Sequence, residues 1–380
     1  MNTVAIIGAG PAGLQTALKL KEEGFDSTIF EEHETIGLPE HCSGLISKKG
    51  VHELGLNLSD SLQNEIKGAR IYSPSGHSIE VKKHETVAYV VDRKKFDQIL
   101  LRRARLLGIH VATDTKLIDV RKNTLFVQSN GRGELRKAEI IIGADGVNST
   151  VRHLIGLETS KENFIHTIQA TCSGNFDDKM VQVHLGDYAK GFFAWVIPIS
   201  KERAKIGLGS VLGEDVSENL KKFISIKVPG ARPQKYDSAL IPYGPPLTGI
   251  TKENMAIVGD SAFHTKATTG GGVIFGMKAG NILGETLADM FKRKATLKDY
   301  EKRMEPLNNE LKMHWKIRKY ANSLNNQEID ELFLKLKNKG IEDFLEKEGN
   351  MDEPSKFIGK LATNPKYLFM TGTILKFLRS

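Results

Sequence analysis

Short apolar runs and one helical pattern alternate over the first 30 residues. Thr3–Ile7 is a short, mostly apolar run, which is typical of a strand buried inside a parallel sheet. Residues 14–23 repeat apolar side chains at helical spacing, and Gly24 ends that pattern. A second short strand, Ser27–Phe30, follows directly. The order strand, helix, strand predicts the start of an α/β domain.

The pattern changes twice further along the chain. Residues 94–108 have helical spacing, and several short β-type segments follow them. Residues 160–250 alternate apolar and polar side chains with turn residues at intervals, which predicts an antiparallel sheet that residues 69–91 join. From Leu297 onwards the chain is helical and highly charged, and residues 328–345 keep one helical spacing.

A glycine-rich turn lies between the first strand and the first helix. Gly8 permits the tight turn, Gly10 lets the backbone approach a pyrophosphate, and Gly13 allows the helix to pack closely on the strand. The helix N-terminus attracts the phosphate charge. Glu31 follows the second strand, where an acidic side chain binds ribose hydroxyls and disfavours a 2′-phosphate. This half-site predicts a bound dinucleotide, either FAD or NAD.

A second glycine signal lies about 250 positions later. Gly259-Asp260 follows a short apolar run, and Gly270–Gly272 comes soon after it. Glycines let a backbone approach a ligand closely, and the helix that starts near Val273 adds its dipole. Both signals together predict a flavin enzyme that wraps FAD from the two ends of one discontinuous domain.

These patterns predict an α/β (α+β) protein with three parts. The parts are a Rossmann-like FAD-binding domain in residues 1–68, 92–158 and 251–296, a second, antiparallel β-sheet substrate domain in residues 69–91 and 159–250, and a C-terminal helical region in residues 297–380.

Composition and charge narrow the class of protein. The 380 residues are 40% apolar and 26% charged, as in an ordinary soluble globular protein. The net charge of +8 is spread along the chain without a basic stripe, so we expect no nucleic-acid partner. The positive excess suits anionic lipid headgroups, an acidic redox partner or simple solubility.

Cysteine usage and hydropathy bear on the compartment. The chain has two cysteines, Cys42 and Cys172, and no CxxC pair, so we expect no metal or iron–sulfur site and no disulfide framework. The first strand begins at Thr3, which leaves no room for a signal peptide. No stretch approaches the roughly 20 apolar residues needed to span a bilayer. We expect a cytoplasmic protein, with peripheral contact on the inner face of the cell membrane as an open alternative.

Two further segments carry a resemblance to a known family. Pro39–Gly44 resembles a Pro…Cys-Gly segment near the flavin. Phe193–Pro198, followed by Gly207 and Gly209, resembles an aromatic-x-Trp-x-aromatic-Pro…Gly-x-Gly signature. With both glycine loops, these segments make residues 1 to about 310 similar to the geranylgeranyl reductase family, within the flavoprotein group that includes p-hydroxybenzoate hydroxylase.

The chain departs from the family pattern at four positions. Ser43 separates the cysteine from the glycine that usually follows it, and Ile197 stands in place of an aromatic residue. Phe263 and Ala267 stand where many relatives have Gly and Pro. These departures affect the details beside the flavin more than the fold.

The resemblance implies an FAD-dependent oxidoreductase that hydrogenates isolated carbon–carbon double bonds of geranylgeranyl chains. In archaea these chains are ether-linked to glycerol phospholipids. The cofactor would carry the difficult step, hydride delivery to one alkene carbon, while the protein aligns the substrate, excludes water and lets a proton reach the other carbon. The electron donor is either reduced ferredoxin or NADPH.

Glycine chemistry and the resemblance together give the expected site residues. We expect FAD contacts from Gly8, Gly10, Pro11, Ala12, Gly13, Glu31, Glu32, Cys42, Ser43, Gly44, Arg93, Asp145, Gly259, Asp260, Gly270, Gly271, Gly272 and Val273. The candidates for a catalytic role are Cys42, His41 and Trp195. His264, on the second glycine loop, is a candidate proton donor in the same way as His41. The candidates to line an apolar substrate tunnel are Phe192, Phe193, Trp195 and Pro198.

Three alternatives remain open at this point. The apolar C-terminal stretches 367–370 and 374–378 either dock on a membrane surface or pack over the substrate domain. The enzyme could instead be a flavin monooxygenase that hydroxylates an aromatic compound, because it would share both FAD motifs. It could also be an electron-transfer flavoprotein that reduces a quinone.

Overall fold

The computed structural model describes residues 3–370, and the side chains up to Tyr367. The apolar stretch 374–378 therefore lies outside the described residues. A six-stranded sheet forms the centre of the nucleotide-binding part, in the order β18-β19-β12-β1-β2-β8, and is parallel except for the edge pair β18–β19. Its strands are β1 (Val4–Ile7), β2 (Thr28–Phe30), β8 (His110–Ala112), β12 (Ile140–Gly143), β18 (Thr251–Lys252) and β19 (Met255–Ile257).

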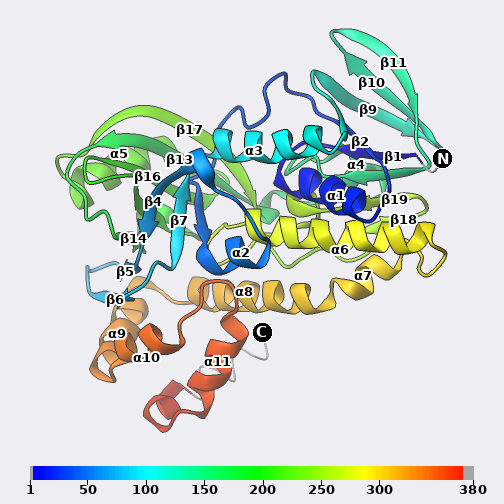
Figure 1. Cartoon of the computed structure of the whole chain (residues 1–380). Coiled ribbons are helices and arrows are strands. Elements are labelled where there is room, and N and C mark those ends of the chain that lie inside the picture. The colour runs from blue at the N-terminus through cyan, green and yellow to red at the C-terminus, as the bar shows by residue number, and fades with distance from the viewer. Residues whose placement is uncertain (1–2, 371–380) are drawn as a thin grey trace.

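Two helices from opposite ends of the domain pack against each other beside this sheet (Figure 1). They are α1 (Pro11–Glu22) and α6 (Val273–Phe291). Three glycines of α6 allow the close approach: a Cβ on Gly280 would lie 2.8 Å from the Ala12 carbonyl oxygen, and one on Gly284 would lie 2.8 Å from the Lys19 Cβ. Gly276, one turn earlier, faces Ala12 and Gly259 in the same way.

Further elements surround the central sheet. The helices are α3 (Arg93–Leu106) and α4 (Thr150–Leu154). Three strands, β9 (Thr115–Arg121), β10 (Thr124–Ser129) and β11 (Arg132–Lys137), form a separate antiparallel sheet that projects from the body (Figure 1).

A seven-stranded sheet forms the second layer of the molecule, in the order β17-β13-β16-β15-β14-β5-β6. It is antiparallel except where β5 pairs in parallel with β14, which corrects the expectation of an entirely antiparallel sheet. The strands are β5 (Gly68–Tyr72), β6 (Ser78–Lys82), β13 (Phe164–Ser173), β14 (Met180–His184), β15 (Ala194–Pro198), β16 (Arg203–Val211) and β17 (Arg232–Pro242). A helix that the alternation did not predict, α5 (Val216–Lys227), covers one face and buries Ala204, Ile206 and Leu208.

The segment 69–91 does not stay together in the second sheet. Its last strand, β7 (Ala88–Val91), lies between β3 (Leu45–Ser47) and β4 (Leu62–Ile66) in a small sheet of its own. Alternation predicts a half-buried strand but does not say which strand it pairs with, so the sequence put β7 in the wrong sheet. The short helix α2 (Lys48–Glu53) follows β3.

Helices form the C-terminal part of the described chain. They are α7 (Asp299–Arg303), α8 (Glu305–Ser323), α9 (Asn326–Asn338), α10 (Ile341–Glu348) and α11 (Pro354–Thr363). Residues 328–345, for which helical spacing is expected, form two helices instead of one, because Gly340 adopts a φ of 70° and separates α9 from α10. Single 3₁₀ turns occur at Ser59–Ser61, Lys161–Asn163, Asp187–Ala189, Gly259–Ala262 and Pro365–Met370.

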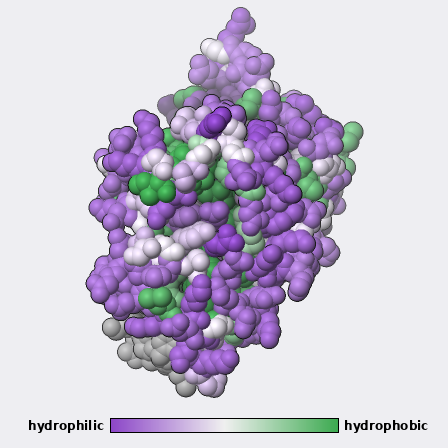
Figure 2. All heavy atoms as spheres, turned by 90° about the vertical axis from the view of Figure 1, so that its left-hand side faces the viewer, coloured by the Kyte–Doolittle hydropathy of each residue, from purple (hydrophilic) through white to green (hydrophobic). Residues whose placement is uncertain are grey.

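The architecture confirms the predicted fold class, a nucleotide-binding α/β layer with a second sheet and a helical C-terminal part. Within residues 3–370, no helix has the length and hydropathy needed to cross a membrane. Figure 2 shows the face at the left of Figure 1, which is mostly hydrophilic with hydrophobic residues in small separate areas.

The α1–α6 contact makes a testable prediction about stability. We expect Gly280→Ala to lower the free energy of unfolding by about 1–3 kcal/mol, because the added methyl group overpacks the contact with Ala12 and Thr16. Urea unfolding of the purified protein measures this change. Gly359→Ala in α11 is the matched control: nothing lies within 4 Å of its added Cβ, so this change should be neutral or stabilise by about 0.5–1 kcal/mol. Equal effects of the two substitutions would contradict the prediction.

Candidate functional site

The three glycines of the first loop have different surroundings. Gly8 has a φ of 103°, and a Cβ there would lie 2.3 Å from the Ala144 carbonyl oxygen. A Cβ on Gly13 would lie 2.1 Å from the Gly8 oxygen. Gly10 differs, because no protein atom lies within 4 Å of its Cβ position and it begins α1 without a side-chain cap. Gly8 and Gly13 therefore serve internal packing, and Gly10 leaves open space at the helix N-terminus.

Glu31 fixes the shape of this loop. Its Oε2 atom accepts a hydrogen bond from the Ala9 amide at 2.7 Å, and its Oε1 atom accepts from the His33 amide at 2.9 Å. The His33 ring nitrogen lies 2.7 Å from the same Oε1 atom. A carboxylate has about four lone-pair positions, of which the Ala9 amide uses one on Oε2. Glu32, also expected at the cofactor, is exposed and forms an ion pair with Lys116 at 2.9 Å.

The second glycine loop packs directly on the first. Gly259 has a φ of 75°, and a Cβ there would lie 2.8 Å from the Ala12 Cβ, next to Pro11 at the start of α1. Asp145 accepts hydrogen bonds from the hydroxyl groups of Ser149 at 2.6 Å and Ser261 at 3.2 Å. Asp145 therefore joins the end of β12 to the second loop through protein contacts.

The second loop leads into the N-terminus of α6. Gly272 is the N-cap of this helix, which begins at Val273, and no side chain caps it. A Cβ on Gly272 would lie 2.6 Å from the Asp260 Oδ1 atom, so the carboxylate faces the helix start. Burial raises the pKa of Asp260, while the Thr265 hydroxyl and the charge of Arg93 act in the opposite direction. A Cβ on Gly271 would meet Lys266, and Gly270 has a φ of 70°.

Cys42 lies between two cations from different parts of the fold. The Lys205 ammonium on β16 donates to the Cys42 carbonyl oxygen at 3.0 Å and to Glu40 at 2.6 Å. Gly44, whose Cβ would lie 2.1 Å from the Val91 oxygen, donates its amide to the Cys42 sulfur at 3.4 Å. Ser43 is half-buried, whereas His41 is exposed.

Arg93 is the second of these cations. It donates to both oxygens of Asp97 at 3.0 and 3.1 Å, and its Nε atom is buried without a partner among the described residues. Burial disfavours the charge, but Asp97 and Cys42 outweigh it and raise the pKa of Arg93 above its usual range. Arg93 therefore keeps its positive charge at the boundary of the two layers.

An aromatic cluster covers the face of the seven-stranded sheet opposite α5. Phe192 stacks on Phe193 with ring centroids 4.3 Å apart, and Phe193 meets Trp195 edge to face at 5.9 Å. Two glycines of β16 give these rings room: a Cβ on Gly207 would lie 2.5 Å from Trp195, and one on Gly209 would lie 2.7 Å from Phe192.

The aromatic cluster reaches the second glycine loop. A Cβ on Gly270 would lie 3.3 Å from the Phe192 ring, so the two expected sites adjoin. Pro198 is buried at the end of β15, and its carbonyl oxygen accepts from Asn64 at 2.9 Å. Three of the four predicted substrate residues therefore lie in one cluster beside the second loop, while Pro198 lies at its far end.

Residues of α8 that the sequence analysis missed hold this junction together. Arg318 donates to the carbonyl oxygens of Thr268 at 2.6 Å and Ala267 at 3.0 Å, and its guanidinium lies 4.8 Å from the Phe192 ring centroid. Burial lowers the pKa of Arg318 to about 10, so it stays charged at neutral pH. His314 lies 2.6 Å from the Thr268 hydroxyl, and burial together with the charge of Lys266 lowers its pKa to about 3.

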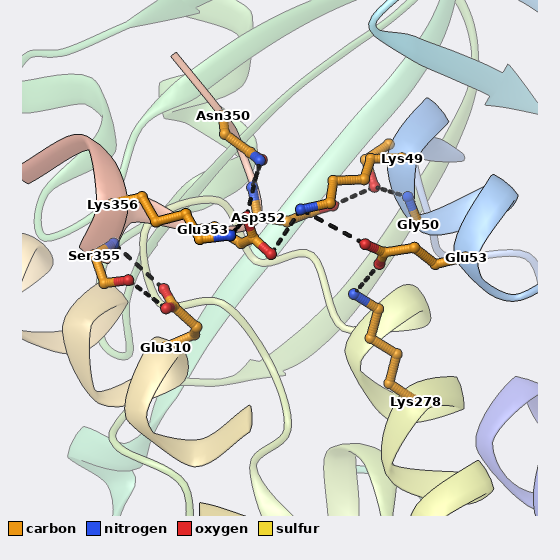
Figure 3. A network of polar contacts seen from close by, with 11 residues as sticks. Lys49, Gly50, Glu53, Lys278, Glu310, Asn350, Asp352, Glu353, Ser355 and Lys356 are labelled. Carbon is orange, nitrogen blue, oxygen red and sulfur yellow. Dashed lines mark hydrogen bonds and ion pairs between the residues drawn. The ribbon is translucent and has the colours of Figure 1, made fainter. Parts of the chain in front are cut away.

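A C-terminal segment, residues 350–355, also binds the second loop, and Figure 3 shows its further contacts with Lys49 and Glu310. Asp352 forms a buried ion pair with Lys266 at 2.7 Å and accepts a hydrogen bond from Ser47. Figure 3 shows Glu353 beside Lys49, 2.6 Å apart. Met351 packs against the aromatic cluster, so this segment joins the second glycine loop to the predicted substrate residues.

One signal for these contacts was present in the sequence. Lys205, Gly207 and Gly209 alternate along a strand, which puts the lysine on the same face as the two motif glycines. Arg318, His314 and Asp352 had no such signal, because their partners lie about 50 to 305 positions away in the sequence.

The second loop generates a prediction about pH. The His264 Nδ1 atom accepts from the Gly259 amide at 3.1 Å, and burial lowers the pKa of His264 from 6.5 to about 3. Below pH 6.5 the unfolded chain binds a proton here and the folded protein does not. For this one group, the free energy of unfolding therefore falls by about 1.4 kcal/mol for each unit by which the pH is lowered. His264→Asn keeps an acceptor and removes the proton.

When the pH is lowered from 6.5 to 4.5, we therefore expect the free energy of unfolding to fall less in His264→Asn than in the wild type. The two losses should differ by at most about 2.7 kcal/mol. Urea unfolding at several pH values measures the difference. The exposed His110, replaced by Asn, is the control and should follow the wild type. Parallel curves for the wild type and His264→Asn would show that the buried imidazole does not resist protonation.

Comparisons with known proteins agree with this geometry. Residues 1–223 match the family model described as the FAD binding domain. An uncharacterised protein of Methanocaldococcus jannaschii is 32% identical in an alignment 366 positions long that covers 92% of each chain. Digeranylgeranylglycerophospholipid reductase of Methanococcus vannielii is 27% identical and covers 99% of this chain and 97% of its own.

A solved structure supports the fold. The crystal structure of a geranylgeranyl bacteriochlorophyll reductase-like protein from Thermoplasma acidophilum superposes with a TM-score of 0.86 at 22% identity, over 99% of this chain and all of that one. The predictions of FAD as the cofactor and of an oxidoreductase are confirmed. The chain is an FAD-dependent oxidoreductase and belongs to the geranylgeranyl reductase family, within the larger group of flavoproteins that share the FAD binding domain.

Proposed function

We propose that the two glycine loops hold FAD between them. The amides at the start of α1 bind the pyrophosphate, Glu31 binds the adenosine ribose, and Asp260 binds the ribityl chain. Open space at Gly10 and the uncapped start of α6 at Gly272 support this arrangement, because both leave backbone donors free for an anionic ligand. The buried, unpartnered Nε atom of Arg93 supplies a further donor on the same side.

The reaction that we propose is the hydrogenation of isolated double bonds in geranylgeranyl chains of archaeal-type ether lipid precursors. Reduced FAD, when bound, supplies a hydride. The observation that supports this proposal most directly is the contact between the aromatic cluster and the second loop. Phe192 lies 3.3 Å from the position of a Cβ on Gly270, so a purely apolar chain can lie against the flavin side. The relatives named as digeranylgeranylglycerophospholipid reductases support the same substrate class.

The residues of the chain have separate tasks in this reaction. Phe192, Phe193 and Trp195 align the prenyl chain and exclude water from the reacting carbons. Arg318 holds the second loop against this cluster through three carbonyl oxygens. Cys42, between Lys205 and Arg93, lies at the boundary between cofactor and substrate.

We also propose that the electrons come from reduced ferredoxin or NADPH and that the protein meets its lipid at the membrane surface. The net charge of +8 suits both an acidic protein donor and anionic lipid headgroups.

Mass spectrometry of the lipid tests the function directly. Purified protein with bound FAD is reduced with dithionite without oxygen and incubated with unsaturated digeranylgeranyl phospholipid. We expect successive gains of two hydrogens per double bond, and none with heat-denatured protein. Unchanged lipid, together with flavin that is bound and reducible, would overturn the proposal. In that event, NADPH oxidation stimulated by a phenol would favour the monooxygenase, and quinone reduction would favour the electron-transfer flavoprotein.

Gly10 gives a sharp test of where the cofactor lies. We expect Gly10→Ala to raise the dissociation constant of FAD at least about tenfold, which is about 1.4 kcal/mol, because the methyl group enters the space assigned to the pyrophosphate. The free energy of unfolding without FAD should hardly change, since the Cβ meets no protein atom and the φ of −70° suits alanine. Isothermal titration of the FAD-free protein and urea unfolding measure the two quantities.

Gly133→Ala on β11 is the matched control, because its Cβ position is equally open and lies on the projecting sheet. This variant should bind FAD as the wild type does. If Gly10→Ala also bound FAD with unchanged affinity, the pyrophosphate would have to lie elsewhere.

A further inference from the structure

Three polar side chains surround one glycine on the site face of the seven-stranded sheet. Gln169 on β13 and Trp195 on β15 are both register partners of Gly207 on β16. Lys205 lies two residues before Gly207 on the same strand, so its side chain points to the same face. The intervening residue, Ile206, packs into the core under α5 instead. The three polar groups therefore belong to the face that carries the aromatic cluster.

Gly207 allows the side chains beside it to approach each other. A Cβ on Gly207 would lie 2.5 Å from the Trp195 ring and 2.6 Å from the Gln169 Cβ. Any side chain at position 207 would separate the indole from the amide. The Gly-x-Gly part of the signature thus lets the Trp195 ring and the Gln169 side chain both lie against the backbone at Gly207, in addition to making room for aromatic rings.

Two of these groups have a polar atom that the protein leaves unused. The Gln169 Oε1 atom and the Trp195 Nε1 atom are buried and have no hydrogen-bond partner among the described residues. The two residues are 4% and 8% exposed. Buried polar atoms in native proteins are almost always paired with protein or with ordered water, so each of these requires a partner.

Lys205 adds a proton donor that reaches toward the surface. Its ammonium has three N–H groups, of which two are used, by Glu40 at 2.6 Å and by the Cys42 carbonyl oxygen at 3.0 Å. The Lys205 side chain is 8% exposed and that of Glu40 is 21% exposed. The pair therefore forms a path from the buried face of the sheet to solvent.

We propose that Gln169, Trp195 and Lys205 bind one water molecule that delivers the proton for alkene reduction. The water accepts from the Trp195 Nε1 atom and from the third N–H of Lys205, and it donates to the Gln169 Oε1 atom. This inference rests on the proposed function, because it names the proton source for that reaction. Gln169 and Trp195 act as positioning residues, and Lys205 relays the proton.

The proton and electron balance of this step is simple. One alkene carbon receives a hydride, whose electron pair comes from the reduced flavin, and the flavin becomes oxidised. The π bond breaks, and the other carbon forms a C–H bond with a proton from the water. Lys205 returns a proton to the resulting hydroxide, and Glu40 passes one from solvent to Lys205.

Other buried titratable groups near the site fit this task less well. His264 and His314 have pKa values lowered to about 3 by burial, so neither carries a spare proton at neutral pH. Arg93, whose pKa is raised by Asp97 and Cys42, holds its proton too tightly to release it in a relay. Arg318 uses its donors on the carbonyl oxygens of Ala267, Phe192 and Thr268. Lys266 is engaged by Asp352 in a buried ion pair at 2.7 Å.

Variants at Lys205 separate a proton relay from a structural role. In an anaerobic single-turnover assay, reduced enzyme is mixed with saturating prenyl lipid and flavin oxidation is followed. We expect Lys205→Met to slow this oxidation at least tenfold, with FAD affinity unchanged. Lys205→Arg keeps the hydrogen bonds to Glu40 and Cys42 but cannot release a proton, so it should be slow as well. Full rescue by Lys205→Arg would overturn the relay.

Two further measurements complete the test. The wild type should be slower in deuterated water, and Gln169→Leu or Trp195→Phe should slow the reaction and change this isotope effect, because each removes one partner of the water. Wild-type rates in both variants would overturn the proposal. Lys235→Met is the matched control: Lys235 is an exposed lysine on β17 of the same sheet, 3.3 Å from Asp237, and its loss should leave the rate unchanged.

A crystal structure of the FAD-loaded protein tests the water site apart from any activity. We expect an ordered water at hydrogen-bond distance, about 3 Å, from both the Gln169 Oε1 atom and the Trp195 Nε1 atom. If neither atom has a water there, the inference fails even when the lipid is hydrogenated. If the water is present but no prenyl lipid reacts, the proposed function fails instead.

Discussion

The structure depends on the close contact between α1 and α6. These helices begin at the two glycine loops, which lie about 250 positions apart in the sequence. The loops can form one site only if the helix backbones come nearly into contact, and Gly276, Gly280 and Gly284 allow this because they have no Cβ. The same contact sets Ala12 against Gly259 and so fixes the distance between the two glycine loops, the two halves of the proposed FAD site.

Buried charges connect that site to the second sheet. Lys205 joins the Cys42 segment to β16, Arg318 joins the second loop to Phe192, and Lys266 joins the same loop to Asp352. Buried ion pairs contribute little net stability, because desolvation offsets much of the attraction. Their value here is geometric: breaking one leaves an uncompensated buried group, so the cofactor side and the substrate side stay in one fixed arrangement.

Local patterns predicted the glycine turns of the proposed site, and long-range pairing limited the rest. The strand–glycine–helix order placed Gly8, Gly10 and Gly13 at the turn, because those roles follow from backbone geometry within six residues. The pairing of β7 could not be predicted, since alternation is the same whichever strand lies beside it. Arg318 looked like one more charged residue of a polar helix, and only its burial against Phe192 shows its role.

The sequence by itself determined the elements whose cause is local: the two glycine loops, the acidic end of β2, and the alternation that puts Lys205, Gly207 and Gly209 on one face. It also carried the resemblance that identifies the family. Only the tertiary structure decided which distant residues lie together, namely Ala12 with Gly259, Gln169 and Trp195 on either side of Gly207, and Asp352 with Lys266. The physical reason is that periodicity reports the environment of each residue, buried or exposed, whereas the partner of a buried polar group depends on how separate segments pack.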